Sequence, residues 1–518
     1  MRRLRAVRRL RVTVVDLTTE RPTRALYARL MNANLASIMP QVIAVWCEQA
    51  GHDVTYVCYT GFEDLEEEVL EPADVVFIGA FTQAAHTAYA ISAVHRRNGA
   101  VTVLGGPHAR CYPQDSSRYF DYVLGFTTRE MVEDVLRERE PRPQGGQLVS
   151  APGQPEHLPG VEERWKFIEA TLDKTPVLKI VPMLGSLGCP YTCSFCIDST
   201  VEYQPLGFDQ IRSDLRFVLT KMDHPRVGWH DPNFGVRFDD YLGAIEDVVP
   251  PGSIDFFAES SLSLLSEPHL QRLQKNGFKV IFPGIESWFA LGNKAKTGRD
   301  VGMEKVRRVA DHINMVMRYI PYVQTNFVLG LDSDEGKEPF ELTKRFVDLA
   351  PGAFPVFSLL SAFGRAAPMN LGLQREGRVL PFPFHFLDAS QSMNVVPKNY
   401  GWHEFYSNLV DVERYTYSAP RIGRRFLANR GLLPKAMNLV RGISSERLDR
   451  VRHHARIRDL LGSDRDVQGF HHGETTELPS FYGDRIRQDL GPLWEALPEG
   501  GLLHDHNAYL RSEATSAA

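Results

Sequence analysis

The chain has 518 residues, a formal net charge of −5 at pH 7 and 43% hydrophobic residues. So long a chain exceeds one ordinary hydrophobic core, and we expect several domains. The small net charge gives no case for a nucleic-acid partner, and the absence of a run of about 18 apolar residues predicts no transmembrane segment. Six cysteines are too few for a disulfide scaffold, which favours a cytoplasmic protein.

Residues 1–11, MRRLRAVRRLR, form a strongly basic stretch. It lacks the apolar segment that a signal peptide needs. We interpret it as a solvated basic tail, and a weak contact with a membrane or an acidic partner is the alternative.

Residues 12–140 alternate short apolar runs with helical patterns. Strands are expected at LRVTVVDL, VTYVCY, DVVFIGA, AVTVLGG and DYVLGF, and the first helix over residues 37–50. This alternation predicts an α/β, doubly wound, Rossmann-like domain with a parallel sheet. Ligands on such sheets bind at the carboxyl ends of the strands. Those ends carry the candidate site residues Thr82, Gln83, Gly105, Gly106, His108 and Gly125.

Residues 141–175 begin with a stretch rich in Pro, Gly, Gln and Glu and are expected to form a linker. A second alternating series occupies residues 176–370, with helices expected over 207–222, 238–249, 267–276, 303–318 and 339–349. Six βα-type repeats predict a partial (β/α)6 barrel, in which functional residues lie where strands end. Residues 371–518 predict a mostly helical region, with helices around 403–416, 419–430 and 445–460.

The motif GCPYTCSFC follows the first strand of this second series and contains Cys189, Cys193 and Cys196. Three thiolates at this spacing can hold three irons of a [4Fe-4S] cubane and leave the fourth iron open. Zinc prefers four ligands from paired elements, which the sequence does not offer nearby. Three structural core cysteines are the remaining alternative, because buried cysteine is common.

With its C-x3-C-x2-C spacing and Phe195 before the last cysteine, the segment 176–370 resembles the radical S-adenosylmethionine superfamily. The resemblance implies that the open iron binds the amino and carboxylate groups of S-adenosylmethionine. Cleavage of the sulfonium bond then gives a 5′-deoxyadenosyl radical. It also implies an external electron donor, such as flavodoxin or ferredoxin, to reduce the cluster.

Further positions resemble the superfamily less sharply. Asp231 and Asn233, in the string DPNF, stand where the family places acceptors for the amino group of S-adenosylmethionine, and a plain turn is the alternative. Glu259 ends the third strand, and the string GIES resembles the family's fourth-strand motif. For the GIES string, the alternative is that Ser287 caps the N-terminus of a helix. The remaining candidates are Glu286 and, on the fifth strand, Gln324 and Asn326, for which a structural strand is an equal interpretation.

Residues 12–140 resemble the cobalamin-binding domain that precedes the barrel in one branch of this superfamily. The resemblance rests on DVVFIGAFT, VTVLGGPHA and DYVLGF in this order. The D-x-H-x-x-G motif is absent, which implies that cobalt has no protein lower ligand from this motif. His108 is a candidate ligand, but a lone histidine beside a proline in a loop is more often a local hydrogen-bond partner. A Rossmann-like domain without a cofactor is the structural alternative.

No cysteine follows Cys196, so neither further clusters in the C-terminal region nor a methyl-carrying cysteine there is expected. The resemblance then implies methyl transfer from methylcobalamin to an unactivated carbon, or to phosphorus, after hydrogen abstraction by the 5′-deoxyadenosyl radical. A non-methylating ring-forming or oxidative radical reaction is the second hypothesis. A cobalamin- or redox-sensing binding protein is the hypothesis from another class.

The substrate is expected to be a small molecule. A stretch of the C-terminal region is rich in aromatic residues that could line an apolar substrate site or, more commonly, form plain core. These residues are Phe382, Phe384, Phe386, Tyr400, Trp402 and Phe405.

Overall fold

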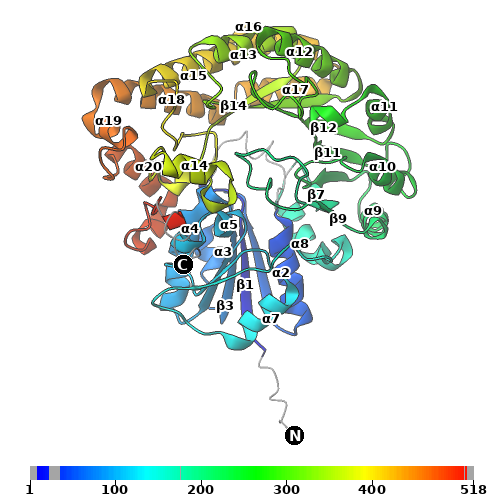
Figure 1. The fold of residues 1–518 in the computed structure, drawn as a ribbon. Coiled ribbons are helices and arrows are strands. Elements are labelled where there is room, and N and C mark those ends of the chain that lie inside the picture. The colour runs from blue at the N-terminus through cyan, green and yellow to red at the C-terminus, as the bar shows by residue number, and fades with distance from the viewer. Residues whose placement is uncertain (1–8, 23–35, 176, 507, 510–518) are drawn as a thin grey trace.

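The computed structural model describes residues 9–22, 36–175, 177–506 and 508–509. The first eight residues of the expected basic tail therefore lie outside the described part. The molecule contains two separate parallel sheets, followed by a helical region (Figure 1). No helix among the described residues is long and apolar enough to cross a membrane.

The first sheet has the strand order β2-β1-β3-β4-β5-β6, and all its pairings are parallel. Its strands are β1 (Arg11–Leu17), β2 (Asp53–Tyr59), β3 (Val75–Ala80), β4 (Val101–Gly105), β5 (Tyr122–Leu124) and β6 (Gln147–Val149). Val14 and Val15 are adjacent on β1 and belong to different apolar clusters. This follows from the two-residue period of a strand, which needs an apolar layer on each face.

Helices supply those two layers. Val42, on α2 (Ile38–Gln49), and Val132, on α7 (Arg129–Glu138), share the cluster of Val14. Ala88, on α4 (Ala85–Arg97), shares the cluster of Val15. Helices therefore cover both faces of this parallel sheet, as expected for an α/β fold, and the carboxyl ends of its strands point toward the second sheet (Figure 1).

The segment 141–175, expected to be a linker, is largely structured. Residues Gln147–Val149 form β6 and pair with β5, and Val161–Lys174 form α8. Arg164 of α8 is buried and donates to the side-chain carbonyl of Gln41 at 2.7 Å, which ties this segment to the first sheet's helix α2.

The second sheet is also parallel. Its order is β7-β10-β11-β12-β14, and β13 and β15 both pair with β14. The strands are β7 (Ile180–Met183), β10 (Arg226–Trp229), β11 (Asp255–Glu259), β12 (Phe278–Phe282), β13 (Gly284–Glu286), β14 (Tyr322–Leu329) and β15 (Phe354–Leu359). Helices α9 (Phe208–Lys221), α10 (Phe238–Glu246), α11 (Glu267–Lys275), α12 (Gly302–Tyr319) and α13 (Glu338–Leu349) agree closely with the predicted ranges.

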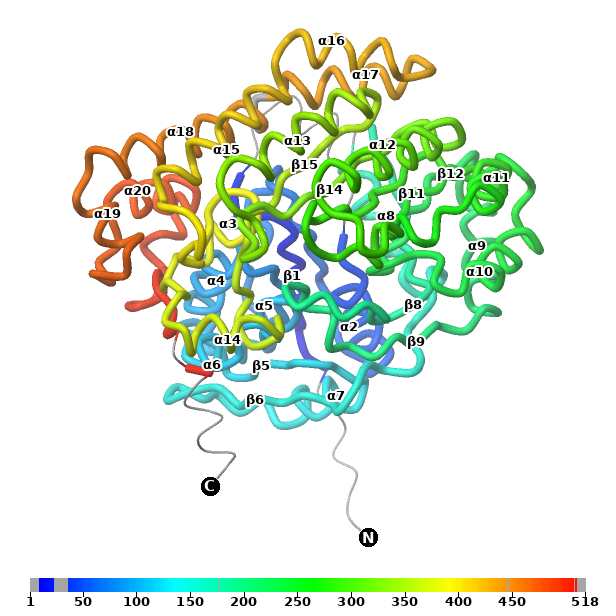
Figure 2. Tube along the Cα trace, turned by 45° about the horizontal axis from the view of Figure 1, so that its top comes forward, coloured from blue at the N-terminus to red at the C-terminus, as the bar shows by residue number. Residues whose placement is uncertain are grey.

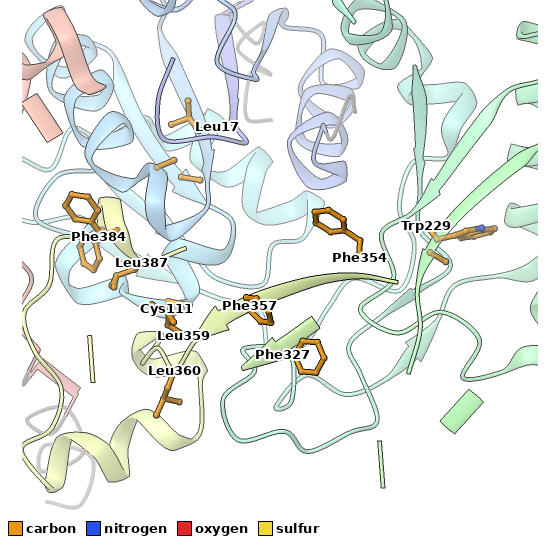
Figure 3. Packing of buried hydrophobic residues seen from close by; sticks show 14 of the residues in the cluster. Leu17, Cys111, Trp229, Phe327, Phe354, Phe357, Leu359, Leu360, Phe384 and Leu387 are labelled. Atoms are coloured by element: carbon orange, nitrogen blue, oxygen red, sulfur yellow. The ribbon is translucent and has the colours of Figure 1, made fainter. Parts of the chain in front are cut away.

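The second sheet curves around a concave interior, with these helices on its outer side (Figures 1 and 2). Phe327 on β14 and Phe357 on β15 pack with ring centroids 5.9 Å apart and belong to the main apolar cluster (Figure 3). Aromatic packing of this kind fixes β15 against its neighbour and so fixes the position of the sheet's last strand.

The C-terminal region is mostly helical, as expected. Its helices are α14 (Met369–Arg375), α15 (Trp402–Thr416), α16 (Ala419–Ala428), α17 (Leu432–Gly442), α18 (Ser445–Ser463), α19 (Arg465–His471) and α20 (Ser480–Leu490). The aromatic stretch packs as core: Phe382 lies against Tyr482 with ring centroids 4.9 Å apart, and Phe384 lies against Tyr112 at 4.5 Å. All six aromatic candidates are buried, so the plain-core interpretation applies to them.

Candidate functional site

The cysteine loop follows β7 and the short strand β8 (Ser186–Leu187), which pairs antiparallel with β9 (Gln204–Pro205). This pair closes the loop at its base. Cys193 is buried, while Cys189 and Cys196 are partly buried, and all three are free thiols. The backbone N–H of Cys196 donates to the carbonyl of Cys193 at 3.0 Å, which folds the loop into a turn.

Asp231 holds the start of this loop. Its carboxylate accepts hydrogen bonds from the backbone N–H of Gly185 at 2.9 Å, the hydroxyl of Ser186 at 2.7 Å and the hydroxyl of Tyr241 at 3.0 Å. Burial raises the pKa of Asp231 to about 6. Both carboxylate oxygens therefore serve the strand that leads into the cysteines, and a cofactor contact by Asp231 stays a prediction.

A second set of contacts holds the middle of the loop. The hydroxyl of Tyr191 lies 2.5 Å from the hydroxyl of Ser263. Ser261 donates its backbone N–H to the side-chain oxygen of Asn233 at 2.8 Å. The side-chain nitrogen of Asn233 is buried and has no hydrogen-bond partner among the described residues. Asn233 thus offers a buried donor, which suits a carboxylate of a ligand.

Glu286 and Lys294 form an ion pair beside the cysteines. The ammonium of Lys294 lies 2.6 Å from a carboxylate oxygen of Glu286, and both side chains are largely buried. Burial opposes the charge on Lys294, but Glu286 together with the thiols of Cys193 and Cys196 raises its pKa. A Cβ on Gly284 would meet the carboxylate of Glu286 at 2.1 Å, so a larger residue there would displace the ion pair.

The thiols themselves have raised pKa values because they are partly removed from water. Burial raises the pKa of Cys196 to about 11, and the nearby charge of Lys294 opposes this effect at all three cysteines. A thiol must lose its proton to bind iron. Lys294 therefore supplies the positive charge that favours three neighbouring thiolates.

The other predicted residues of the second sheet lie nearby but differ in role. The side chain of Glu259 is accessible to solvent, but many protein atoms lie around it. They remove part of the water around its carboxylate and raise its pKa to about 7. Ser287 accepts from the backbone N–H groups of Phe289 and Ala290. No helix begins at these described residues, so its hydroxyl closes a local turn and the expected helix cap is absent. Gln324 and Asn326 share one face of β14, where the Gln324 amide donates to Asn326 at 2.9 Å.

A cavity of about 290 Å³ lies between the two sheets. On one side, the carboxyl ends of the first sheet line it through Gly79, Gly105, Gly106 and Gly125, together with the start of α2. On the other side it is lined by Ser186, Leu187 and Gly188, directly before the first cysteine, and by Asp198, His230 and Pro232. The cavity therefore joins the predicted ligand edge of one domain to the cysteine loop of the other.

Sterics require glycine at position 106 of the cavity wall. Gly106 has φ +88°, and a Cβ at this position would lie 3.0 Å from the backbone N and O of Ala80. Only glycine fits both the backbone conformation and the close approach. The sequence prediction that Gly105, Gly106 and Gly125 lie at one ligand edge agrees with their place in the cavity wall.

His108 does not line this cavity. It belongs to α5 (Pro107–Cys111), which turns its side chain into the aromatic core, where its Nε2 lies 2.7 Å from the hydroxyl of Tyr89. Burial lowers the pKa of His108 to about 3. The local hydrogen-bond role is therefore the one present. Thr82 and Gln83 follow Phe81, and Phe81 is the residue of this segment that lines the cavity.

Arg110 connects the two halves of the site. Its guanidinium donates to the backbone carbonyl of Ile197 at 2.8 Å and to the carboxylate of Asp198 at 3.3 Å, and lies 5.0 Å from the ring centre of Phe126. The backbone N–H of Asp198 in turn donates to the sulfur of Cys196 at 3.5 Å. The cavity wall is thus linked to the cysteine loop by direct contacts.

Sequence reasoning missed several of these residues. Lys294 lies eight residues after Glu286, and a lone lysine in a loop carries no signal of its own. Arg110 stood beside the predicted glycine pair but had no predicted partner. His230 lines the cavity next to the predicted Asp231, and burial lowers its pKa to about 4. Lys294 is recognised only once the second sheet is folded, and Arg110 and His230 only when the two sheets are placed together.

The residues of the loop fit a cubane cluster. Among the described residues, no group of three His, Cys, Asp or Glu side chains is arranged to share one metal ion. A cubane does not require this, because each cysteine binds a different iron. Three free thiols in one turn beside a largely buried ammonium satisfy the donor set.

Comparison with curated proteins finds two methyltransferases. Bacteriochlorophyllide d C-12(1)-methyltransferase of Chlorobaculum tepidum is 23% identical over 365 residues, which span 68% of this chain and 76% of the relative. Hopanoid C-2 methylase of Rhodopseudomonas palustris is 26% identical over 302 residues, which span 54% of this chain and 53% of the relative. No family model matches the chain.

Solved structures with the same fold include two cobalamin-related enzymes. The cobalamin-dependent S-adenosylmethionine radical enzyme OxsB, with aqua-cobalamin bound, matches with a TM-score of 0.54 at 12% identity over 99% of this chain and 84% of its own. The radical S-adenosylmethionine methyltransferase TsrM from Kitasatospora setae matches with a TM-score of 0.51 at 13% identity over 75% of this chain and 80% of its own. Together with the cysteine motif and the sequence relatives, these matches confirm the resemblance to the cobalamin-dependent radical S-adenosylmethionine superfamily.

Proposed function

We propose that this protein is a radical S-adenosylmethionine methyltransferase that uses a [4Fe-4S] cluster and cobalamin to methylate an unactivated carbon, or phosphorus, of a small molecule. The observation that carries the proposal is the cavity between the two sheets, whose walls are the glycine-rich strand ends and the segment leading into the cysteine loop. S-adenosylmethionine would have to reach cobalamin to pass on its methyl group, and this transfer needs such a shared space.

The chain's own residues then have distinct roles. The cysteines hold the cluster, Lys294 and Glu286 set the charge beside it, and the orphan amide nitrogen of Asn233 donates to the carboxylate of S-adenosylmethionine. The glycines of the first sheet let cobalamin approach the backbone. When bound, the cluster supplies the electron that cleaves S-adenosylmethionine, and cobalamin supplies the methyl group.

The surroundings of the cavity suit this chemistry. Its wall is mostly apolar, with Val14, Ile43, Phe77 and Val103 behind the glycines. An apolar wall excludes water, which would otherwise intercept a reactive radical. We infer that the second sheet acts as the partial (β/α)6 barrel of this superfamily and that an external ferredoxin- or flavodoxin-type donor reduces the cluster.

The test is anaerobic reconstitution of the full chain with iron, sulfide and hydroxocobalamin, followed by reduction with dithionite and addition of S-adenosylmethionine. We expect 5′-deoxyadenosine from the wild type and none from Cys193→Ala. Cys47→Ala, which removes a buried thiol of α2 far from the loop, is the matched control and keeps the activity. Wild-type protein that binds no iron, or Cys193→Ala that still forms 5′-deoxyadenosine, would refute the proposal.

A further inference from the structure

The hairpin of α16 and α17 exposes large apolar side chains at its tip. Leu427, Leu432 and Leu433 have 77%, 87% and 64% of their surface accessible to solvent. α16 lies at the outer edge of the molecule in both views, with α17 beside it (Figures 1 and 2). Single exposed leucines are ordinary, but three of them in adjoining positions at one projecting tip form a patch that calls for a partner.

The hairpin is a well-anchored structure. The guanidinium of Arg425 is buried, donates to the carbonyl of Ala353 at 3.0 Å and lies over the ring of Phe354. The side chain of Asn429 donates to the carbonyl of Gly352 at 2.9 Å. One face of the hairpin is therefore fixed to the start of β15, which leaves the leucines on the opposite, outward side.

The charge of this segment has one sign. Residues 419–443 contain no Asp or Glu, although the whole chain has a net charge of −5. Their cations are Arg421, Arg424, Arg425, Arg430, Lys435 and Arg441.

Not all of these cations face outward. Arg425 and Arg441 are used by the second sheet, and Arg421 and Arg424 both pair with Asp348 of α13. Arg430 is exposed at the tip, and Lys435 is half-buried with its ammonium 5.4 Å from the ring centre of Phe426. Neither has an ion pair with a described residue. They lie on either side of Leu432 and Leu433 in the sequence.

We propose that this hairpin docks the protein onto an anionic lipid membrane. The leucines of the tip would enter the boundary between headgroups and acyl chains, and Arg430 and Lys435 would meet the lipid phosphates. This combination of exposed apolar side chains and unopposed cations is the recognised pattern of interfacial binding. A protein partner would bury the leucines equally well, but a partner surface would not need a segment free of acidic residues.

The proposal is independent of the proposed reaction, because it concerns a surface at the amino ends of the strands of the second sheet, whereas the cysteine loop follows a carboxyl end. It is tested by co-sedimentation of the full-length protein with two kinds of vesicle, phosphatidylcholine alone and phosphatidylcholine mixed with phosphatidylglycerol. We expect binding to the anionic vesicles, weaker binding to the neutral ones and release at high salt.

Two double variants locate the contact. Leu432→Ser/Leu433→Ser removes the apolar tip, and Arg430→Glu/Lys435→Glu reverses its charge. Each should weaken partitioning onto anionic vesicles by about tenfold or more. All four side chains are outside the buried core of the hairpin, so the variants should keep the wild-type circular dichroism spectrum and melting temperature.

Matched controls use exposed residues elsewhere. Leu148→Ser/Val301→Ser removes two other exposed apolar side chains, 45% and 51% accessible to solvent, and should bind as the wild type does. Lys275→Glu/Lys398→Glu makes the same change of net charge away from the hairpin and should weaken binding far less. No binding to anionic vesicles, or equal losses in variants and controls, would overturn the proposal. So would self-association of the wild type that the leucine variant abolishes without any vesicle binding, because the partner would then be a second copy.

Discussion

The ammonium of Lys294 lies 2.6 Å from the carboxylate of Glu286, and its charge also acts on the thiols of the cysteine loop. The pair is largely buried, so removal of one partner leaves an uncompensated charge. We expect Lys294→Met to lower the free energy of unfolding by about 2–4 kcal/mol and to reduce iron incorporation. The double variant Lys294→Met/Glu286→Gln should recover part of the stability but not the iron. Chemical denaturation and iron analysis measure both. Wild-type iron content in Lys294→Met would show that the ammonium has no role at the thiols.

Asp231 should act through the start of the cysteine loop. Asp231→Ala leaves the N–H of Gly185 and the hydroxyls of Ser186 and Tyr241 without their acceptor. Each buried donor left unsatisfied costs about 1–3 kcal/mol. We therefore expect a lower melting temperature together with a lower iron content. Tyr241→Phe, which removes one of the three donors, should show a smaller loss of both. Unchanged melting and iron content in Asp231→Ala would contradict this role.

Gly106→Ala tests the cavity wall of the first sheet. The added Cβ would be both strained by φ +88° and 3.0 Å from the backbone of Ala80. We expect cobalamin affinity, measured by absorbance titration, to fall by about tenfold, because a shift that relieves such strain costs on the order of 1–3 kcal/mol.

Gly99→Ala is the control for that experiment. Gly99 has a similar φ of +83°, but a Cβ there meets nothing within 4 Å. It should lower stability without changing cobalamin affinity. Equal affinity in both variants would remove Gly106 from the cofactor site.

Glu413 makes stability depend on pH. Its carboxylate is fully buried and lies 2.9 Å from Nδ1 of His454, and Nε2 of the same imidazole lies 3.0 Å from the carbonyl of Ser390. Burial alone would raise the pKa of Glu413, but His454 and Arg450 hold it below its ordinary value of 4.5. A carboxyl with a lowered pKa contributes stability above its ordinary value and loses it as the pH falls through the folded value.

We therefore expect Glu413→Gln to cost about 3 kcal/mol at neutral pH. The difference from the wild type should shrink in acid, when Glu413 itself becomes protonated. Urea denaturation at several pH values measures this. A constant difference between wild type and variant across the acidic range would exclude the ion pair as its cause.

The sequence predicts much of this fold because hydrophobic residues recur at clearly different spacings in its strands and in its helices. The helix expected over 303–318 is α12, Gly302–Tyr319, and the cysteine motif marks the loop after β7. The segment 141–175 was missed for a physical reason. β6 has only three residues, of which two are exposed, so it shows no alternation of apolar and polar residues. Its place in the sheet depends on its pairing with β5.

The site was predicted less completely. Its residues could be named from motifs, but their partners come from distant segments. His108 follows a strand end and yet points into the core, because Pro107 starts a short helix there. Asp231 was expected to face a ligand, and the motif gave no sign that its oxygens also accept from Gly185, Ser186 and Tyr241. The contacts of these side chains depend on which hydrogen-bond donors the fold brings near them, and no local sequence pattern predicts those contacts.

The most direct test of the account is the yield of S-adenosylhomocysteine from the reconstituted, reduced protein in a single turnover without substrate. If cobalamin in the cavity between the two sheets carries the methyl group, about one equivalent of S-adenosylhomocysteine should form for each bound cobalamin, and Gly106→Ala should lower this yield in step with its cobalamin content. Protein that binds both cofactors and cleaves S-adenosylmethionine to 5′-deoxyadenosine, but never forms S-adenosylhomocysteine, would contradict methyl transfer and favour a non-methylating radical reaction.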